Sequence, residues 1–233
     1  MTREEYIKRL LEHYLIVSVL SEKNGCKVIR IRNRQKNTDL VLRSFSVPVP
    51  AYDELYKIKN ENLPIIYDTV TLSDGQIVLE EYIDGITVAQ IMETGKYRYM
   101  GARKIIKSVC SALTIIHNLG ITHRDIKPEN VMISKNGRVV LIDFNASNKM
   151  SKAKRDTVVM GTVGYASPEQ LGISRSDART DIYALGVMLN VMLTGKHPSE
   201  LIAKGKAGRI VRKSTSINPD ERYQTAERLA KAL

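Results

Sequence analysis

The segment ITHRDIKPENVMI, residues 121–133, concentrates side chains that could transfer a phosphoryl group. It holds a carboxylate (Asp125), a cation (Lys127) and a side-chain amide (Asn130) between apolar, strand-like ends. A second carboxylate, Asp143, follows an apolar run that predicts a short buried strand. Phosphoryl transfer needs a carboxylate to position the hydroxyl, a lysine to screen the migrating charge, and oxygen ligands for Mg²⁺. These four residues therefore predict a phosphotransfer site.

The part of the chain before this segment is dominated by strand-like runs separated by polar turns. Thr2 and Glu5 fit the capping-box pattern, so we expect a helix at the start of the sequence. A short helix is predicted over 52–62, after the proline-containing segment 47–51. The predicted strands are 14–20, 26–33 and 39–45, followed by a hairpin of 65–72 and 76–83.

Helices dominate the remainder of the chain. Apolar residues repeat at spacings of three and four from Ile105 to Ile116, and Gly120 ends that predicted helix. The segment 181–195 is apolar on nearly every face and predicts a buried helix, whereas 225–233 predicts a short amphipathic one. The sequence therefore predicts an α+β fold with two lobes. The lobes are a small β-rich one over 1–82 and a larger helical one over 83–233.

The composition is that of a globular protein and excludes several other classes. Of the 233 residues, 43% are apolar and 26% are charged. No apolar run reaches the roughly 20 residues of a membrane span, and the first residues do not form a signal peptide, so a cytoplasmic protein is expected. Cys26 and Cys110 predict neither a disulfide nor a zinc site. The net charge of +11 favours acidic partners, but the basic residues are scattered and predict no nucleic-acid binding.

Five motifs in order along the chain resemble those of the eukaryotic-type protein kinases, and the resemblance covers nearly the whole sequence. They are HRDIKPEN at 123–130, Asp143-Phe144-Asn145, GTVGYASPE at 161–169, Asp181, and Arg222 in NPDERY. The residues after Lys127 are similar to the serine/threonine pattern, and the compact chain looks most like bacterial members. The resemblance implies a kinase that uses ATP with Mg²⁺, or Mn²⁺ in its place, and phosphorylates protein substrates.

The resemblance assigns roles to the residues of the phosphotransfer site. Asp125 would orient the substrate hydroxyl and accept its proton, Lys127 would contact the γ-phosphate, and Thr162 would brace both. Asn130 and Asp143 would bind the metal ion. Structural roles are implied for His123 and Phe144 in a hydrophobic column, for Asp181 on the catalytic-loop backbone, and for Glu169 paired with Arg222.

The resemblance also identifies EEYIDG, residues 80–85, as a hinge that binds the nucleotide base. The adenine would form hydrogen bonds with the backbone of Glu81 and Ile83. Its apolar contacts would be Val28, Val41 and Met132. Glu80 falls at the back of this pocket, and a buried carboxylate needs a partner that the sequence does not name.

Two departures from the family pattern concern the phosphates of the nucleotide. The glycine positions of the covering loop hold Ser21, Lys23 and Cys26, so side chains such as Lys23 or Lys27 are expected to cover the phosphates instead.

The second departure is Arg43, which stands in the place of the phosphate-gripping lysine. A planar guanidinium does not replace a compact ammonium at a tight site. Its acidic partner is predicted on the following helix, with Glu54 preferred to Asp53. Arg30 is an alternative cation on the neighbouring strand.

A third departure is Asn145, which replaces a glycine. The position is expected to need a positive φ, which asparagine tolerates better than most residues. In the loop that follows, Thr157 is the preferred phosphorylation site, with Arg124 as the cation that would bind its phosphate.

Three functions fit these residues. The first is an active serine/threonine kinase, because no base or metal ligand is lost. The second is a pseudokinase or scaffold, which the altered loop and Arg43 favour. The third is a small-molecule kinase, which usually lacks a segment such as GTVGYASPE and therefore ranks last.

Overall fold

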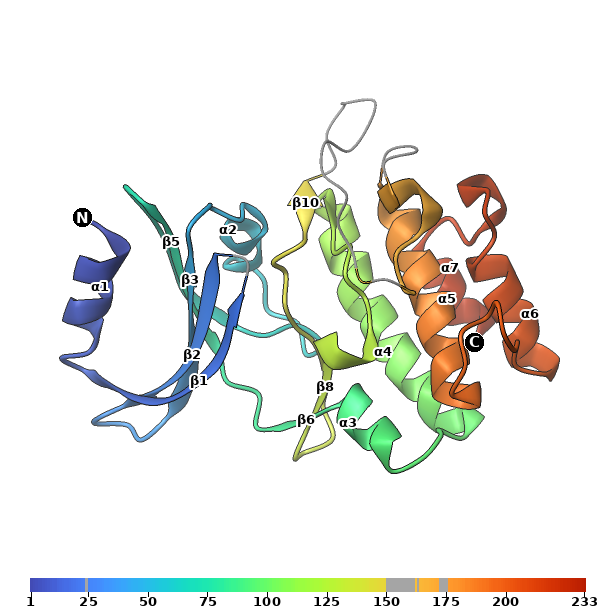
Figure 1. The fold of residues 1–233 in the computed structure, drawn as a ribbon, viewed down its shortest axis with the longest axis horizontal. Coiled ribbons are helices and arrows are strands. Elements are labelled where there is room, and N and C mark those ends of the chain that lie inside the picture. The colour runs from blue at the N-terminus through green and yellow to red at the C-terminus, as the bar shows by residue number, and fades with distance from the viewer. Residues whose placement is uncertain (24, 150–161, 163, 172–175) are drawn as a thin grey trace. The chain divides into compact units, whose positions relative to one another are not determined.

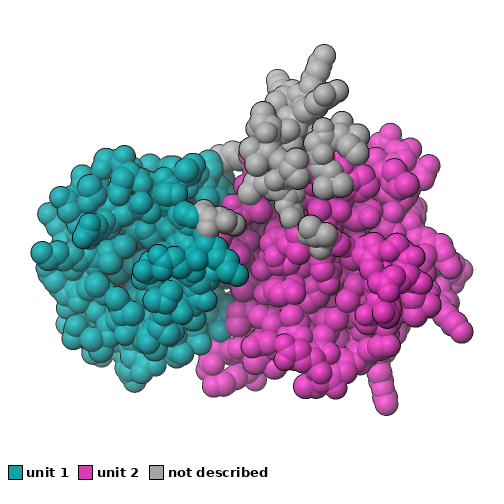
Figure 2. Space-filling view, viewed as in Figure 1, with its two compact units in different colours: residues 1–60, 64–83 teal, residues 61–63, 84–233 magenta. Residues whose placement is uncertain are grey.

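The structure is a computed structural model that describes residues 1–23, 25–149, 162, 164–171 and 176–233. It divides into two units (Figure 2). Unit 1 comprises residues 1–60 and 64–83, and unit 2 comprises residues 61–63 and 84–233. The segment 61–63 therefore belongs to unit 2, although it interrupts unit 1 in the sequence.

Unit 1 is built on a five-stranded antiparallel sheet with the strand order β1-β2-β3-β5-β4 (Figure 1). The predicted strands are confirmed, because β-branched and aliphatic runs between polar turns favour strands. The strands are β1 (Tyr14–Lys23), β2 (Cys26–Asn33), β3 (Asp39–Phe45), β4 (Ile66–Leu72) and β5 (Gly75–Glu81).

Helix α1 (Arg3–Leu10) covers one face of this sheet. The predicted capping box is present: the Glu5 backbone N–H donates to Thr2 Oγ1 (3.3 Å), and the Thr2 N–H donates to Glu5 Oε2 (2.8 Å). Tyr6, Ile7 and Leu10 of the helix pack against a buried cluster of alternate strand residues. The cluster consists of Ile29, Ile31, Leu42, Ile77 and Leu79.

Helix α2 (Ala51–Leu55) is shorter than the predicted helix over 52–62. Only Ala51, Tyr52 and Leu55 of this helix are buried. The residues that follow, KIKNEN, add no apolar face that could pack on the sheet, and their asparagines favour turns over helix.

Unit 2 is mainly helical, and its long helices pack against one another (Figure 1). Helix α5 (Ala178–Thr194) is buried along most of its length, as its apolar sequence predicted. The predicted ends at glycine are also confirmed, since Gly120 and Gly195 have φ values of 71° and 72° after α4 and α5. The remaining helices are α3 (Val88–Glu93), α4 (Tyr99–Asn118), α6 (Gly205–Ser214) and α7 (Ala226–Ala232).

Short strands and 3-10 turns carry the polar segments of unit 2. Two small sheets have the orders β6-β8-β9 and β10-β7. Their strands are β6 (Gly85–Thr87), β7 (Ile121–Thr122), β8 (Val131–Ser134), β9 (Val139–Leu141) and β10 (Asn148–Lys149). The 3-10 turns are η1 (Pro128–Asn130), η2 (Pro168–Leu171) and η3 (Pro219–Glu221). Among the described residues, no helix has the length and apolar character that a membrane crossing requires.

The core of unit 1 predicts a strong effect of the substitution Leu42→Ala. The Leu42 side chain is 1% exposed in the cluster beneath α1, so we expect the free energy of unfolding to fall by about 2–5 kcal/mol. The control is Leu15→Ala on β1, where the side chain is 45% exposed, and where we expect a change of about 0.5 kcal/mol or less. Urea denaturation measures both, and equal losses would contradict the assignment of the core.

Candidate active site

Strands β8 and β9 bring Asn130 and Asp143 to the same end of a two-stranded ladder. Val131 pairs with Leu141 in this antiparallel pair, so the residue before β8 and the residues after β9 lie side by side. The Ile142 N–H donates to the Asn130 carbonyl oxygen (2.9 Å), which extends the ladder by one hydrogen bond. The two predicted metal ligands therefore lie near each other, although they are separated in sequence.

Asp125 is the centre of a polar cluster in unit 2. Its Oδ2 atom lies 2.8 Å from Lys127 Nζ, and its Oδ1 atom accepts a hydrogen bond from Thr162 Oγ1 (2.7 Å). Lys127 Nζ also donates to Thr162 Oγ1 (2.7 Å), so the expected contacts of Thr162 with both residues are present. The Asn130 amide nitrogen donates to Asp125 Oδ2 (2.9 Å) and to the Asp125 carbonyl oxygen (2.8 Å).

The amide orientation of Asn130 decides which of its atoms is available to a metal ion. Since the nitrogen donates to Asp125, the oxygen Oδ1 is the atom that could bind Mg²⁺. Together with the Asp143 carboxylate it offers hard oxygen donors of the kind that Mg²⁺ prefers. One or two such protein ligands suffice when substrate phosphates complete the coordination.

The cluster keeps the Asp125 carboxyl ionised. Burial raises its pKa, but the hydrogen bonds from Lys127 and Thr162, together with the positive charge of Lys127, lower it more. The net pKa is below the ordinary value for aspartate. Asp125 is therefore a negatively charged hydrogen-bond acceptor at neutral pH, suited to orient a hydroxyl group.

A fully buried carboxylate on α5 holds the backbone beside Asp125. Asp181 Oδ2 accepts the His123 N–H (2.9 Å), and Asp181 Oδ1 accepts the Arg124 N–H (2.8 Å), as predicted. Arg124 has a φ of 70°, a left-handed conformation that costs a non-glycine residue about 1–2 kcal/mol. A further contact, from His117 Nε2 to Asp181 Oδ2 (2.8 Å), was not predicted, because a lone histidine on a helix does not indicate its partner.

The expectation of a positive φ at Asn145 is wrong. Within the described residues, the non-glycine positions with positive φ are Asn37, Arg124 and Asp143, and Asp143 has a φ of 68°. The left-handed residue of this turn is therefore the carboxylate itself, because aspartate tolerates this region nearly as well as asparagine does. Asn145 does not stand in for a strained glycine.

His123 and Phe144 are packing residues, as predicted. Both are fully buried, and their ring centroids lie 4.8 Å apart in an edge-to-face contact. Burial lowers the pKa of His123, against smaller opposing effects of nearby carboxylates, so the ring is neutral. A neutral, fully buried imidazole does not take part in proton transfer with solvent or substrate.

In unit 1, strand alternation separates the core cluster from the residues predicted to contact nucleotide. Val28 lies directly opposite Arg43 on the neighbouring strand, and Arg43 lies opposite Val78. Val41 lies opposite Glu80. These side chains share the face that α1 does not cover, since the cluster beneath α1 uses the alternate positions of the same strands.

The structure shows the carboxylate of Glu80 on Arg43, a contact that the prediction of Glu54 or Asp53 did not include. Arg43 Nε donates to Glu80 Oε1 (2.8 Å), and Arg43 Nη2 lies 2.7 Å from the same oxygen. Glu54 forms an ion pair with Lys57 (3.8 Å), and Asp53 accepts hydrogen bonds from the side chains of Thr69 and Gln76 (both 3.1 Å). The contact was missed because it crosses between strands, and only the register reveals it. It also supplies the partner that Glu80 needed.

Arg30 and Lys27, which were also predicted as cations for the phosphates, bind carboxylates of unit 1. Arg30 binds Asp39 through Nε (2.7 Å) and lies over the Tyr82 ring (4.1 Å to the centroid). Lys27 lies across the hairpin from Glu22 (3.1 Å).

The residues at the positions where the family pattern has glycines do not form a long loop. Ser21 and Lys23 lie in β1 and Cys26 lies in β2, and Lys23 pairs with Cys26. The hairpin therefore leaves room for only two residues between its strands. Gly25 has a φ of 73° there.

The predicted hinge residues differ in what their backbone can offer to a ligand. The Glu81 N–H donates to the Ile65 carbonyl oxygen (2.8 Å), and the Ile65 N–H donates to Glu81 Oε2 (3.1 Å). Only the carbonyl oxygen of Glu81 could then bond to an adenine amino group. Ile83 is buried, and Met132 in β8 is half-buried.

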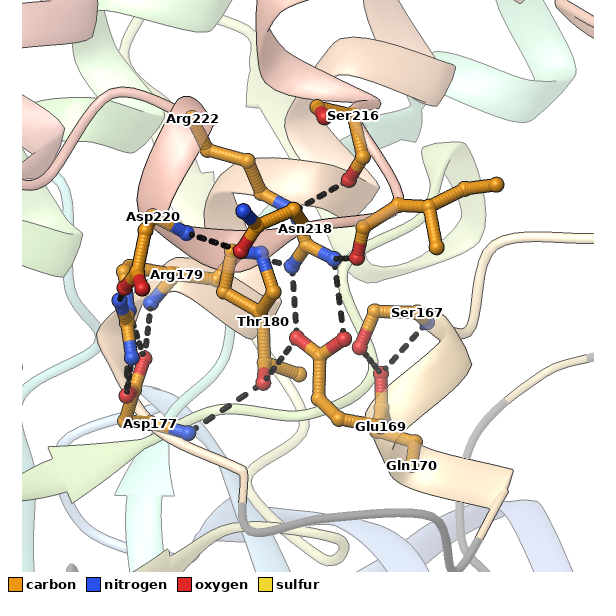
Figure 3. A network of polar contacts seen from close by, with 12 residues as sticks. Ser167, Glu169, Gln170, Asp177, Arg179, Thr180, Ser216, Asn218, Asp220 and Arg222 are labelled. Carbon is orange, nitrogen blue, oxygen red and sulfur yellow. Dashed lines mark hydrogen bonds and ion pairs between the residues drawn. The ribbon is translucent and has the colours of Figure 1, made fainter.

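Glu169 and Arg222 form the predicted ion pair at the centre of a polar network in unit 2 (Figure 3). The contact is bidentate: Nη1 donates to Oε1 (2.6 Å) and Nη2 donates to Oε2 (2.9 Å). The remaining donors of the guanidinium bind backbone carbonyl oxygens, so all five N–H groups are satisfied in a buried site. These carbonyl groups belong to Ser216 (2.7 Å), Arg179 (3.1 Å) and Ile217 (3.1 Å).

Comparisons with known proteins identify the family of this chain. The family described as "Protein kinase domain" matches residues 22–232, so the chain belongs to the protein kinase family. It is 34% identical over 193 residues to the serine/threonine-protein kinase PknB of Mycolicibacterium smegmatis, covering 69% of this chain and 31% of the relative. It is 30% identical over 225 residues to a probable serine/threonine-protein kinase of Clostridium perfringens, covering 85% of this chain and 32% of the relative.

A third relative is the serine/threonine-protein kinase D of a Synechocystis strain, 29% identical over 225 residues. That alignment covers 86% of this chain and 44% of the relative. The chain thus spans less than half the length of each of these relatives. Thr157, the predicted phosphorylation site, lies outside the described residues.

The Glu169–Arg222 pair predicts a pH-dependent stability. Burial raises the pKa of the Glu169 carboxyl, but the hydrogen bonds from Arg222 and the backbone lower it more, so the folded-state pKa lies below the ordinary value of 4.5. A carboxyl whose pKa is lowered by folding stabilises the protein above its unfolded-state pKa, and this contribution is lost as the pH falls.

We therefore expect Glu169→Gln to cost about 3–5 kcal/mol of unfolding free energy at pH 7. The difference from the parent protein should shrink as the pH falls below about 4.5. Urea denaturation at pH 7, 5, 4 and 3 measures it. Glu200→Gln, which breaks an exposed pair with Lys196, is the matched control, with an expected cost of about 1 kcal/mol or less. A loss at Glu169 that is constant across this pH range would contradict the assignment.

Because the φ of Asn145 is not positive, we expect that glycine is not preferred at this position. Asn145→Gly should lower the unfolding free energy by about 0.4–1 kcal/mol, because glycine adds freedom to the unfolded chain without relieving strain. The control is Asn37→Gly, at a residue with a φ of 52°, where relief of strain should offset this loss. Urea denaturation compares the two, and a more stable Asn145→Gly protein would contradict the observed backbone.

Proposed function

We propose that this chain catalyses transfer of the γ-phosphoryl group of ATP to serine or threonine hydroxyls of protein substrates. The observation that carries the proposal is the cluster of Asp125, Lys127, Thr162 and Asn130, whose side chains make contacts of 2.7–2.9 Å with one another and with the Asp125 carbonyl oxygen. Membership of the protein kinase family supports the same reaction class.

The proposed mechanism follows from the charge and position of these side chains. The ionised Asp125 would accept a hydrogen bond from the attacking hydroxyl and take its proton. The hydroxyl oxygen would form a bond to the γ-phosphorus while the bond from that phosphorus to the β–γ bridging oxygen breaks and ADP leaves. Lys127, held by Asp125 and Thr162, would stabilise negative charge on the transferred phosphoryl group. Thr162 would keep the carboxylate and the ammonium at a fixed separation.

A divalent cation fits the oxygen donors of Asn130 and Asp143. When bound, Mg²⁺ would neutralise charge on the phosphates, and Mn²⁺ is the alternative with the same ligand preference. Arg43, Val28, Val41, Glu81, Ile83 and Met132 are proposed nucleotide contacts on the basis of the family resemblance. A cytoplasmic location and acidic protein partners are proposed from the composition and the charge of +11.

The test is incorporation of labelled phosphate from ATP, with Mg²⁺ and Mn²⁺ compared. Asp125→Asn should lower the rate by about 10²–10⁴-fold, because a general base contributes on that order. The matched control is Asp220→Asn, an exposed aspartate of unit 2 that pairs with Arg179 and should leave the rate unchanged. If the parent protein incorporates no label at any metal concentration, the proposal fails and a binding function without phosphotransfer takes its place.

A further inference from the structure

The Arg43–Glu80 pair places two opposite charges in a nearly dry position on the sheet of unit 1. Arg43 is 5% exposed and Glu80 is 3% exposed. Removing both charges from water costs several kcal/mol per ion, and apolar residues of similar volume are often as stable as such a pair. The stability of the sheet therefore does not explain why this position holds an ion pair.

Strand register fixes the position of Glu80 relative to Arg43. Arg43 lies opposite Val78 in the β3–β5 ladder, and Glu80 is two residues further along β5, so both side chains point from the same face. The backbone hydrogen bonds of the sheet hold the two Cα atoms in place. The register thus keeps the Glu80 side chain within reach of Arg43 on the same face.

The contact itself defines the direction of the guanidinium. Arg43 Nε and Nη2 both contact the same oxygen, Glu80 Oε1. This pair uses one edge of a planar group that carries five N–H donors. Two contacts to one oxygen direct this edge of the guanidinium toward Glu80.

We propose that Glu80 is the positioning residue for Arg43 and presents its guanidinium to the phosphates of the nucleotide. This inference rests on the proposed function for its assignment of Arg43 to the phosphates. The partner predicted for Arg43 lies on the helix that follows β3, whereas Glu80 lies on strand β5 of the sheet.

The experiment measures the dissociation constants of ATP and of adenosine for the full chain and its variants by titration calorimetry. Glu80→Gln should weaken ATP binding by about tenfold or more, because a charge-assisted contact is lost, and should leave adenosine binding unchanged. In an Arg43→Met background, Glu80→Gln should have no further effect on ATP binding, since the two residues act as one unit. Asp74→Asn, which breaks the Arg3 pair of the same unit, is the matched control and should leave both constants unchanged.

Several outcomes would overturn the proposal. They are equal weakening of ATP and adenosine by Glu80→Gln, an effect that adds fully to that of Arg43→Met, or no effect on ATP. If Glu80→Gln does not fold, Glu80→Asp, which keeps the charge and withdraws it by one methylene group, is measured instead with the same expected selectivity for ATP.

Nucleotide binding also separates this inference from the proposed function. A chain that binds ATP in a Glu80-dependent manner but transfers no phosphate would refute the kinase activity and leave the role of Glu80 intact. A chain that transfers phosphate, but whose affinity for ATP does not depend on Glu80, would support the kinase activity and refute the role of Glu80.

Discussion

The geometry of the candidate active site depends on one buried carboxylate, Asp181. Its two oxygens accept the backbone N–H groups of His123 and Arg124, directly before Asp125. These two hydrogen bonds stabilise Arg124 at a φ of 70°. This backbone turn sets the direction of the Asp125 side chain. Because Asp181 lies in the first turn of the long buried helix α5, the catalytic segment is anchored to the core of unit 2.

The same principle recurs at the other buried charges. Glu169 is compensated by a guanidinium whose five donors are all used, and Glu80 is compensated by Arg43. In each case, burial of the carboxylate alone would cost free energy, and pairing it with a guanidinium both offsets this cost and fixes the positions of the two residues relative to each other. The pairs connect segments far apart in sequence, so they fix tertiary position more than local structure.

The sequence predicted the strands and the long helices because alternation, helical periodicity and terminal glycines are local signals. It also predicted the Asp125 cluster and the Glu169–Arg222 pair, since the family motifs specify those residues directly. It did not predict the Arg43–Glu80 or His117–Asp181 contacts, which depend on strand register and helix packing that no local pattern encodes. The left-handed residue at Asp143 was misplaced to Asn145 because both residue types tolerate that conformation, and only the turn decides between them.

The departures from the family pattern in unit 1 fit together physically. With Ser21, Lys23 and Cys26 at the glycine positions, this hairpin is less suited than a glycine-rich loop to bring backbone N–H groups close to phosphates. Recognition of phosphate would then rely more on side-chain cations. Arg30 binds Asp39 and Lys27 binds Glu22, so each already has a carboxylate partner on its own strand pair. Arg43 is held by Glu80 on the face of the sheet opposite to α1, beside Val28 and Val41. An arginine is suited to this arrangement, because its planar group can bind an orienting carboxylate along one edge and still carry donors along the others.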